Sequence, residues 1–222
     1  MSVQKLQIEH WTVRVRKPEG EGPHPIMLLL HGWMGDENAM WVFASRLPKN
    51  LLLVAPRAPH PAPNQGYSWI NHRSAAFATL ADFDPAVDAL LDLLALRPGA
   101  PNQDFGEISL LGFSQGAALA YAFAARHPDR VRSLAGLAGF VPHGVEALCP
   151  GHPFSGKPIF VAHGTQDQIV PVTMARQGVR ILERCGAHVT YCEDQVGHKV
   201  SAGCFRAMDG FFRKTYGDNG KM

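Results

Sequence analysis

The chain alternates short, continuous apolar runs with longer stretches in which apolar residues recur at helical spacing. Short continuous runs are typical of strands that are buried on both faces, as in a parallel sheet. Such runs occupy 25–30, 51–55, 108–111, 134–137, 159–162 and 189–192. Residues 8–15 instead alternate between apolar and polar, which predicts an edge strand or one arm of a hairpin.

The stretches between these runs have the apolar stripe of amphipathic helices. The clearest begins at Asp84, which suits an N-cap, and continues with Pro85, which suits the first turn. Helices are predicted over 37–47, 84–96, 115–127, 172–185 and 201–216. This order of strands and helices predicts an α/β fold with a mostly parallel central sheet and helices on both faces.

Two proline-rich stretches, 56–64 and 140–157, predict loops, and the first cannot be regular because its prolines remove backbone donors. No insertion is long enough to form a large lid domain, and 217–222 is predicted to be a frayed tail. A length of 222 residues suits a single domain spanning 1–222.

The bulk composition is that of a globular protein, with 46% hydrophobic and 18% charged residues. A net charge of +2 without a run of Lys or Arg argues against nucleic acid or an anionic membrane as a partner. The chain also has no apolar stretch of transmembrane length and no apolar region typical of a secretory signal near its start. We therefore expect a cytoplasmic protein without stable membrane association, a monomer or homodimer that acts on a small molecule.

The cysteines and histidines show no metal-ligand spacing, so we expect no metal and no cofactor. The four cysteines, Cys149, Cys185, Cys192 and Cys204, also lack CxxC spacing. We expect them to be free thiols in a reducing compartment, with a single Cys185–Cys192 bridge as the alternative.

Residues 112–116 read Gly-Phe-Ser-Gln-Gly and match the pattern G-x-S-x-G. The motif follows a predicted strand and opens a predicted helix, which is the setting of a nucleophile elbow. In such an elbow a strained turn projects the serine hydroxyl from the end of the sheet, and the glycines avoid collisions between strand and helix. Ser114 is therefore the predicted nucleophile, against the alternative of an ordinary glycine-rich turn.

A serine hydroxyl needs a base and an acid that orients the base, in the chain order Ser, Asp, His for this elbow. His198 lies in a predicted loop after the last strand, where an open α/β sheet gathers its site. Asp167 lies in a similar loop after the run at 159–162. We predict His198 as the base and Asp167 as its orienting acid. The alternatives are that Asp167 caps a turn and that Asp194 orients the base.

Acyl transfer also needs two donors aimed at the developing oxyanion. One is predicted to be the backbone N–H of Gln115, and the other that of Trp33, with Met34 as the alternative. The residues predicted to line a pocket for an apolar acyl group are Met34, Trp69 and Phe140. His31 is expected to hold the oxyanion loop and to have no chemical role.

These motifs make the chain similar to the phospholipase/carboxylesterase family of α/β-hydrolases, which includes acyl-protein thioesterase-like enzymes. The residues that carry the resemblance are 30–36, 56–69, 112–116, 163–167 and 197–198. The family's oxyanion loop often reads His-Gly-Leu-Gly-Asp, whereas here one residue is added and Trp33 replaces the leucine. The resemblance implies an α/β-hydrolase fold without a large lid and hydrolysis of carboxylic esters or thioesters.

The favoured reading is a carboxylesterase that works through Ser114, His198 and Asp167 and an acyl-enzyme. Thioesterase, lysophospholipase and peptidase activities share the same three residues and stay open. Without a large lid, we expect hydrolysis of dissolved short or medium esters without interfacial activation. The alternative hypothesis outside the enzymes is a non-catalytic binding protein of the hydrolase fold, which typically lacks one of the three residues.

Overall fold

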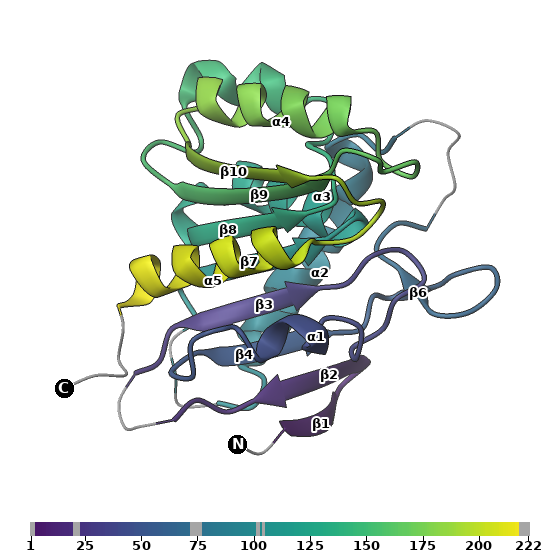
Figure 1. Cartoon of the computed structure of the whole chain (residues 1–222). Coiled ribbons are helices and arrows are strands. Elements are labelled where there is room, and N and C mark those ends of the chain that lie inside the picture. The colour runs from purple at the N-terminus through teal and green to yellow at the C-terminus, as the bar shows by residue number, and fades with distance from the viewer. Residues whose placement is uncertain (1–2, 20–22, 72–76, 101–102, 104, 218–222) are drawn as a thin grey trace.

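A computed structural model describes residues 3–19, 23–71, 77–100, 103 and 105–217 (Figure 1). Its centre is an eight-stranded sheet with the order β1-β2-β4-β3-β7-β8-β9-β10. The strands are β1 (Val3–Ile8), β2 (Trp11–Arg16), β3 (Ile26–Leu30), β4 (Leu52–Pro56), β7 (Ile108–Phe113), β8 (Val131–Leu137), β9 (Pro158–Gly164) and β10 (His188–Asp194). The predicted frayed tail lies outside the described residues, apart from Gly217.

The sheet is parallel from β4 to β10, and only the β1–β2 and β2–β4 pairs are antiparallel. Every residue of β3 and β4 is buried, as the continuous apolar runs predict. The predicted α/β-hydrolase architecture is confirmed. Among the described residues, no insertion between these elements forms a large lid.

Helices cover both faces of the sheet, and alternate strand residues serve the two sides. Met27 and Leu29 of β3 join the core beneath α1 (Trp41–Ala44) and α5 (Ala202–Tyr216), which lie in front of the sheet in Figure 1. Leu28 and Leu30 join the core on the opposite side. The helices there are α2 (Asp84–Ala95), α3 (Gln115–Arg126) and α4 (Val172–Arg184). Short 3-10 helices occur at η1 (Ala81–Phe83), η2 (Pro128–Arg130) and η3 (Val145–Gly151).

Three local predictions need correction. The pattern over 8–15 belongs to two strands, because the chain reverses at Glu9, whose φ is +52°. The helix predicted over 37–47 shortens to α1, since its flanks form successive i→i+3 turns. The proline-rich loop contains β5 (His60–Pro61), which pairs with β6 (Tyr67–Ser68) in a two-residue ladder that does not need the missing donors.

The prediction of free thiols is wrong. All four cysteines are paired, as Cys149–Cys185 and Cys192–Cys204, so the alternative bridge Cys185–Cys192 is wrong as well. The pairing was hidden from spacing because each bond joins two different elements that only the fold brings together. The inference of a reducing compartment rested on free thiols and loses that support.

In the part of the chain that the structure describes, no helix is both long enough and apolar enough to cross a membrane.

Candidate active site

Ser114, Asp167 and His198 meet at the carboxyl edge of the parallel sheet. Ser114 directly follows β7, Asp167 follows β9, and His198 follows β10. The arrowheads of these strands point to the same side of the molecule (Figure 1), so the three connecting loops lie together there. This edge is where open α/β sheets bind their ligands.

Ser114 sits in a strained turn between β7 and α3, with φ of +54° and ψ of −116°. For a residue other than glycine, such a conformation costs on the order of 1–3 kcal/mol and persists only where the surroundings enforce it. Its N–H donates to the carbonyl of Leu137 in the neighbouring strand at 2.8 Å. The backbone of the turn is therefore fixed from the β8 side.

Gly112 and Gly116 lie where other backbone segments pass close to the elbow. A Cβ on Gly112 would lie 2.2 Å from the carbonyl oxygen of Gly116. A Cβ on Gly116 would lie 2.1 Å from the carbonyl oxygen of Leu30. Both contacts are with backbone, which cannot rotate away, so the close approach of β7, α3 and β3 requires glycine at both positions.

The three predicted side chains form one hydrogen-bonded line. Nε2 of His198 lies 3.0 Å from Oγ of Ser114, and Nδ1 lies 2.7 Å from Oδ2 of Asp167. Because a carboxylate only accepts, Nδ1–H is the donor to Asp167. Nε2 of the neutral ring is then free to accept the serine proton, which is the arrangement that activates a serine hydroxyl.

Asp167 is buried and held as a carboxylate. Burial alone would raise its pKa, but donors from the backbone of Val170, from His198 and from the backbone of Ile169 bring the pKa below its ordinary value. The two N–H groups reach Oδ1 at 2.8 and 2.9 Å, which leaves Oδ2 for His198. Asp167 therefore caps its own turn, which was the alternative interpretation, and at the same time accepts from the imidazole of His198.

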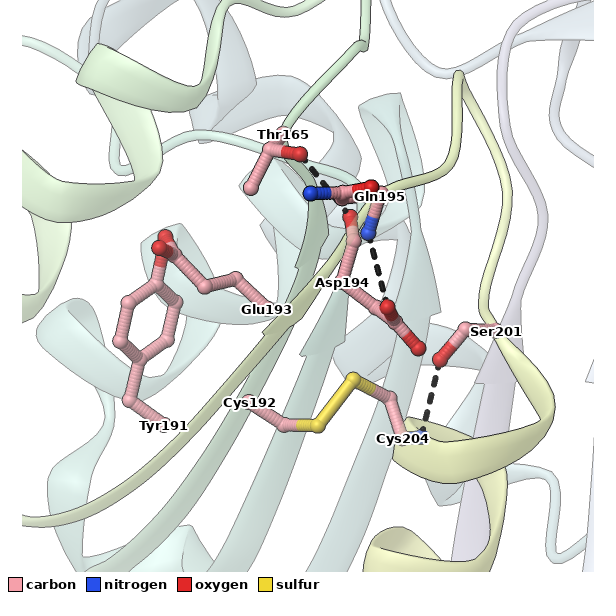
Figure 2. Close-up of a disulfide and its surroundings, with 8 residues drawn as sticks. All are labelled: Thr165, Tyr191, Cys192, Glu193, Asp194, Gln195, Ser201 and Cys204. Carbon is pink, nitrogen blue, oxygen red and sulfur yellow. Dashed lines mark hydrogen bonds between the residues drawn. A yellow bond between two sulfur atoms is a disulfide. The ribbon is translucent and has the colours of Figure 1, made fainter.

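Asp194, the rival for that position, has other contacts. Its Oδ1 accepts from the N–H of Gln195 at 2.8 Å, and its carbonyl accepts from Thr165 (Figure 2). These bonds stabilise the start of the loop that carries His198. The residue that accepts the hydrogen bond from Nδ1–H of His198 is Asp167.

His31 holds the loop that follows β3. Its buried Nε2 accepts from the N–H of Ala58 at 3.0 Å, and Nδ1 lies 2.8 Å from the carbonyl oxygen of Gly32. Burial lowers the pKa of His31 more than its neighbouring acceptors raise it, so the ring is neutral. Both ring nitrogens are engaged in holding backbone.

The two predicted oxyanion donors come from different loops, Gln115 from the elbow and Trp33 from the loop after β3. Gln115 is the first residue of α3, where helix N–H groups have no partner within the helix. Its side chain accepts from the N–H of Trp69 at 3.0 Å and so braces the neighbouring loop. The N–H of Met34 donates to the carbonyl of Tyr67 at 3.0 Å, which weighs against Met34 as the second donor. Trp33 is 41% exposed.

Glu37 anchors the far end of the same loop. Its buried carboxylate receives two hydrogen bonds from Arg57, at 2.8 and 2.9 Å, and an ion pair from Lys5 at 2.8 Å. Burial alone would raise the pKa of Glu37, but the hydrogen bonds from Arg57 and Lys5 lower it to about 2. The sequence alone did not single out this contact, because its partners come from 20 or more residues away.

A cavity of about 350 Å³ lies beside Ser114, between α1 and α5. Gly32 in its wall lies close to the serine, since a Cβ added there would lie 3.2 Å from Cβ of Ser114. Next to Ser114 in the chain, Phe113 also lines the cavity, and its ring centroid is 5.1 Å from that of His198. The lining residues are Gly32, Ala39, Met40, Val42, Phe43, Phe113, Lys199, Val200 and Phe205.

None of the three predicted pocket residues lines this cavity. Trp69 is 1% exposed, and its Nε1–H donates to the carbonyl of His31 at 2.8 Å, so it braces the loop from within the core. Phe140 is also buried, and its ring packs edge-on against Phe77. Val42 of α1, which lines the cavity, is 66% exposed, and the apolar pattern over 37–47 did not distinguish it from a core residue. Across the described ranges, no three His, Cys, Asp or Glu side chains form a group that could hold a metal ion.

Comparison with known proteins finds relatives in sequence. The sequence model of the phospholipase/carboxylesterase family matches residues 12–216. A curated relative, acyl-protein thioesterase 1 of Yarrowia lipolytica, is 27% identical over 173 residues, which cover 70% of this chain and 75% of that protein.

Solved structures agree in fold. The carboxylesterase of Bacillus cereus superposes with a TM-score of 0.80 at 19% identity, covering 94% of this chain and 96% of that one. Acyl-protein thioesterase 2 of Zea mays superposes with a TM-score of 0.76 at 18% identity, covering 92% and 99%. At such identities the likeness speaks for the fold.

Proposed function

Because this chain belongs to the phospholipase/carboxylesterase family, whose hydrolase activity its fold also supports, we propose that it hydrolyses carboxylic esters with Ser114 as nucleophile. His198 is the base and Asp167 orients it. The observation that carries this proposal is the hydrogen-bonded line from Ser114 Oγ through His198 to Asp167 at the carboxyl edge of the sheet.

In the first half of the reaction, Oγ of Ser114 attacks the acyl carbon while Nε2 of His198 takes the hydroxyl proton. Asp167 stabilises the imidazolium that forms, and its lowered pKa keeps it charged in this role. His198 then gives the proton to the leaving alkoxide. An alcohol departs and an acyl-Ser114 ester remains.

In the second half, water replaces the alcohol. His198 takes a proton from the water as it attacks the acyl carbon, and returns that proton to Ser114 Oγ as the acyl bond breaks. The carboxylic acid leaves and the free enzyme is restored. In both halves the backbone N–H groups of Gln115 and Trp33 donate to the oxyanion, and one such donor is worth about 3–4 kcal/mol of barrier.

The cavity between α1 and α5 is the proposed acyl site. It is walled by aromatic and aliphatic side chains, among them Phe113 next to Ser114 in the chain, with Lys199 as the one charged lining residue. An apolar chain is the group that such walls favour, since it loses contact with water there. A volume of about 350 Å³ suits a short or medium acyl chain.

A thioester substrate is the second candidate, favoured by the relative that is named acyl-protein thioesterase 1. The two chemistries differ only in the leaving group, because the thioester releases a thiolate that needs less help from His198. Matched oxygen and sulfur esters of the same acyl chain separate the two by the ratio of their kcat/KM values.

The test is the hydrolysis of p-nitrophenyl esters from acetate to laurate by wild type, Ser114→Ala and the control Ser155→Ala, whose serine is exposed. We expect wild type and the control to turn over with an optimum at short or medium chains and no rise above the micelle point. Ser114→Ala should be inactive. Ala39→Phe, which places a ring in the cavity, should move the optimum to shorter chains. Equal turnover by wild type and Ser114→Ala would overturn the proposal.

A further inference from the structure

The disulfide Cys192–Cys204 closes the segment of chain that carries His198. Cys192 lies near the end of β10, and Cys204 lies in the first turn of α5, 12 residues later. His198 is at the middle of that segment. Figure 2 shows the bond joining strand and helix directly below the loop.

Hydrogen bonds hold the first half of this loop. The backbone N–H of Thr165 donates to the carbonyl of Asp194, and that of Gln166 donates to the carbonyl of Val196. A Cβ on Gly164 would lie 2.2 Å from the same Val196 carbonyl. The approach to His198 is therefore fixed against the loop that carries Asp167.

The second half of the loop, 199–201, is attached differently. Ser201 is buried and caps α5, since its Oγ accepts from the N–H of Cys204 at 3.1 Å. The position of residues 199–201 thus follows the first turn of α5. That turn is tied to β10 by the covalent bond between Cys204 and Cys192.

The second disulfide offers a comparison within the same chain. Cys149–Cys185 joins η3 to the end of α4, and Cys185 precedes the first residue of β10 by only three positions. It therefore lies toward the amino edge of the parallel sheet, opposite the edge where Ser114, Asp167 and His198 meet. Its loss should leave the loop of His198 in place.

We propose that Cys192 and Cys204 are positioning residues for His198, and that reduction of their disulfide reversibly lowers the hydrolytic activity. This inference rests on the proposed function of His198. In the reduction, a thiolate of an external dithiol attacks one sulfur and the other leaves as a thiolate that takes up a proton. The second thiol of the reagent then releases the first sulfur, so the protein gains two thiols and the dithiol becomes a cyclic disulfide.

Accessibility favours this bond as the one reduced first. Cys192 is partly exposed, whereas Cys149 and Cys185 are both buried. Because exchange requires access of the thiolate to a sulfur, mild reduction should open Cys192–Cys204 before Cys149–Cys185.

The experiment compares Cys192→Ala/Cys204→Ala with the matched control Cys149→Ala/Cys185→Ala, beside oxidised and dithiothreitol-treated wild type. Mass spectrometry after alkylation reports which bonds are present. The readouts are kcat and KM for a p-nitrophenyl ester, the rate of labelling by a fluorophosphonate probe, and hydrogen exchange of residues 195–204. A displacement of about 1 Å in a reacting group costs roughly 10²-fold in rate.

We expect a 10- to 100-fold fall in kcat and in the labelling rate for the 192/204 variant, with faster exchange over 195–204. The control should keep kcat within about twofold even if it melts at a lower temperature. Wild type should lose activity on reduction and regain it on reoxidation. A 192/204 variant with full kcat, or oxidised wild type with free thiols at 192 and 204, would overturn the inference.

Hydrogen exchange also separates this inference from the proposed function. If oxidised wild type fails to hydrolyse any ester, the proposed function fails. Exchange still decides the positioning claim, which is supported by loosening of 195–204 in the 192/204 variant alone and overturned by unchanged exchange there. If the control variant does not fold, partial reduction of wild type, followed by mapping of the bond that opened, makes the same comparison.

Discussion

The elbow of Ser114 and the loop of His198 supply the two partners of one hydrogen bond, yet they are held by different means. The elbow lies between β7, α3 and β3, with backbone atoms within 2.2 Å of any Cβ added at Gly112 or Gly116. The loop of His198 is partly exposed, and a Cβ on Gly197 would meet nothing closer than 3.9 Å. Its shape depends on a few hydrogen bonds and one disulfide.

This difference assigns separate tasks to the two regions. A strained backbone needs a close-packed frame, because only surrounding contacts can offset the cost of the conformation of Ser114. A base needs only a ring in the right place, which local ties can supply. The elbow should therefore respond to mutation through folding, and the loop of His198 through activity.

The largest expected effect is common to both regions. Ser114→Ala and His198→Ala should each lower kcat by about 10⁶-fold, because either change removes the proton transfer that activates the nucleophile. Ester hydrolysis measured beside the exposed control His188→Ala checks this. A variant that kept a tenth of the activity would separate its residue from the chemistry.

Asp167→Asn should come next, with a loss of about 10⁴-fold, since an amide can hold the wrong imidazole tautomer. Asp194→Asn is the matched control and should keep nearly full kcat, because its carboxylate accepts from its own neighbour. Equal losses of kcat in the two variants would make Asp194 the orienting acid.

The lowered pKa of Asp167 also affects stability. Its contribution to the free energy of unfolding is complete above its ordinary pKa and is lost as pH falls through the lowered value.

One substitution made in both regions tests their difference in packing. Gly116→Ala should cost about 3 kcal/mol of unfolding free energy or more, because its Cβ meets the Leu30 carbonyl at 2.1 Å. Gly197→Ala should stay within about 0.5 kcal/mol. Urea unfolding of both proteins measures this, and similar costs at the two sites would remove the contrast.

Removing Cys149–Cys185 should cost more unfolding free energy than removing Cys192–Cys204, whereas removing Cys192–Cys204 should cost more kcat. Cys149–Cys185 spans 36 residues and Cys192–Cys204 spans 12, so loop entropy predicts losses of about 4 and about 3 kcal/mol on removal. The bond that matters more for unfolding is thus expected to matter less for kcat. Thermal unfolding of the two double variants, set beside their kcat values, would show whether the orders differ.

The smallest expected effect concerns the anchor of the oxyanion loop. With a pKa of about 2, Glu37 should add on the order of 2–3 kcal/mol of stability above its ordinary pKa, lost as pH falls toward 2. Glu37→Gln should lower the unfolding free energy at pH 7, and the gap from wild type should close in acid. A gap that is constant with pH would mean that charge is not what Glu37 contributes.

The sheet could be predicted because strands buried on both faces leave continuous apolar runs, as β3 and β4 show. Ser114, Asp167 and His198 could be placed together because each follows a strand and parallel strands end at one edge. At these residues the G-x-S-x-G motif, the chain order Ser, Asp, His and the position after a strand all indicated the same site.

The rest depends on contacts that sequence distance conceals. The disulfide pairs and the bonds of Glu37 join segments that only the folded sheet brings close. Trp69 looked like pocket lining because it follows a loop, but its indole turns inward to His31. The cavity arises where α1 and α5 face each other. The apolar spacing over 37–47 predicted a longer helix than α1, so the sequence did not show the shape of this wall.

The most direct test of the central claim is to trap the acyl-enzyme. Wild type and Ser114→Ala are mixed with a p-nitrophenyl ester, quenched in acid within one turnover and mapped by peptide mass spectrometry. The account predicts one acyl group on Ser114 of wild type, which disappears at the rate of deacylation, and none on the variant. An acyl group on a different residue, or turnover by wild type with Ser114 never acylated, would contradict it.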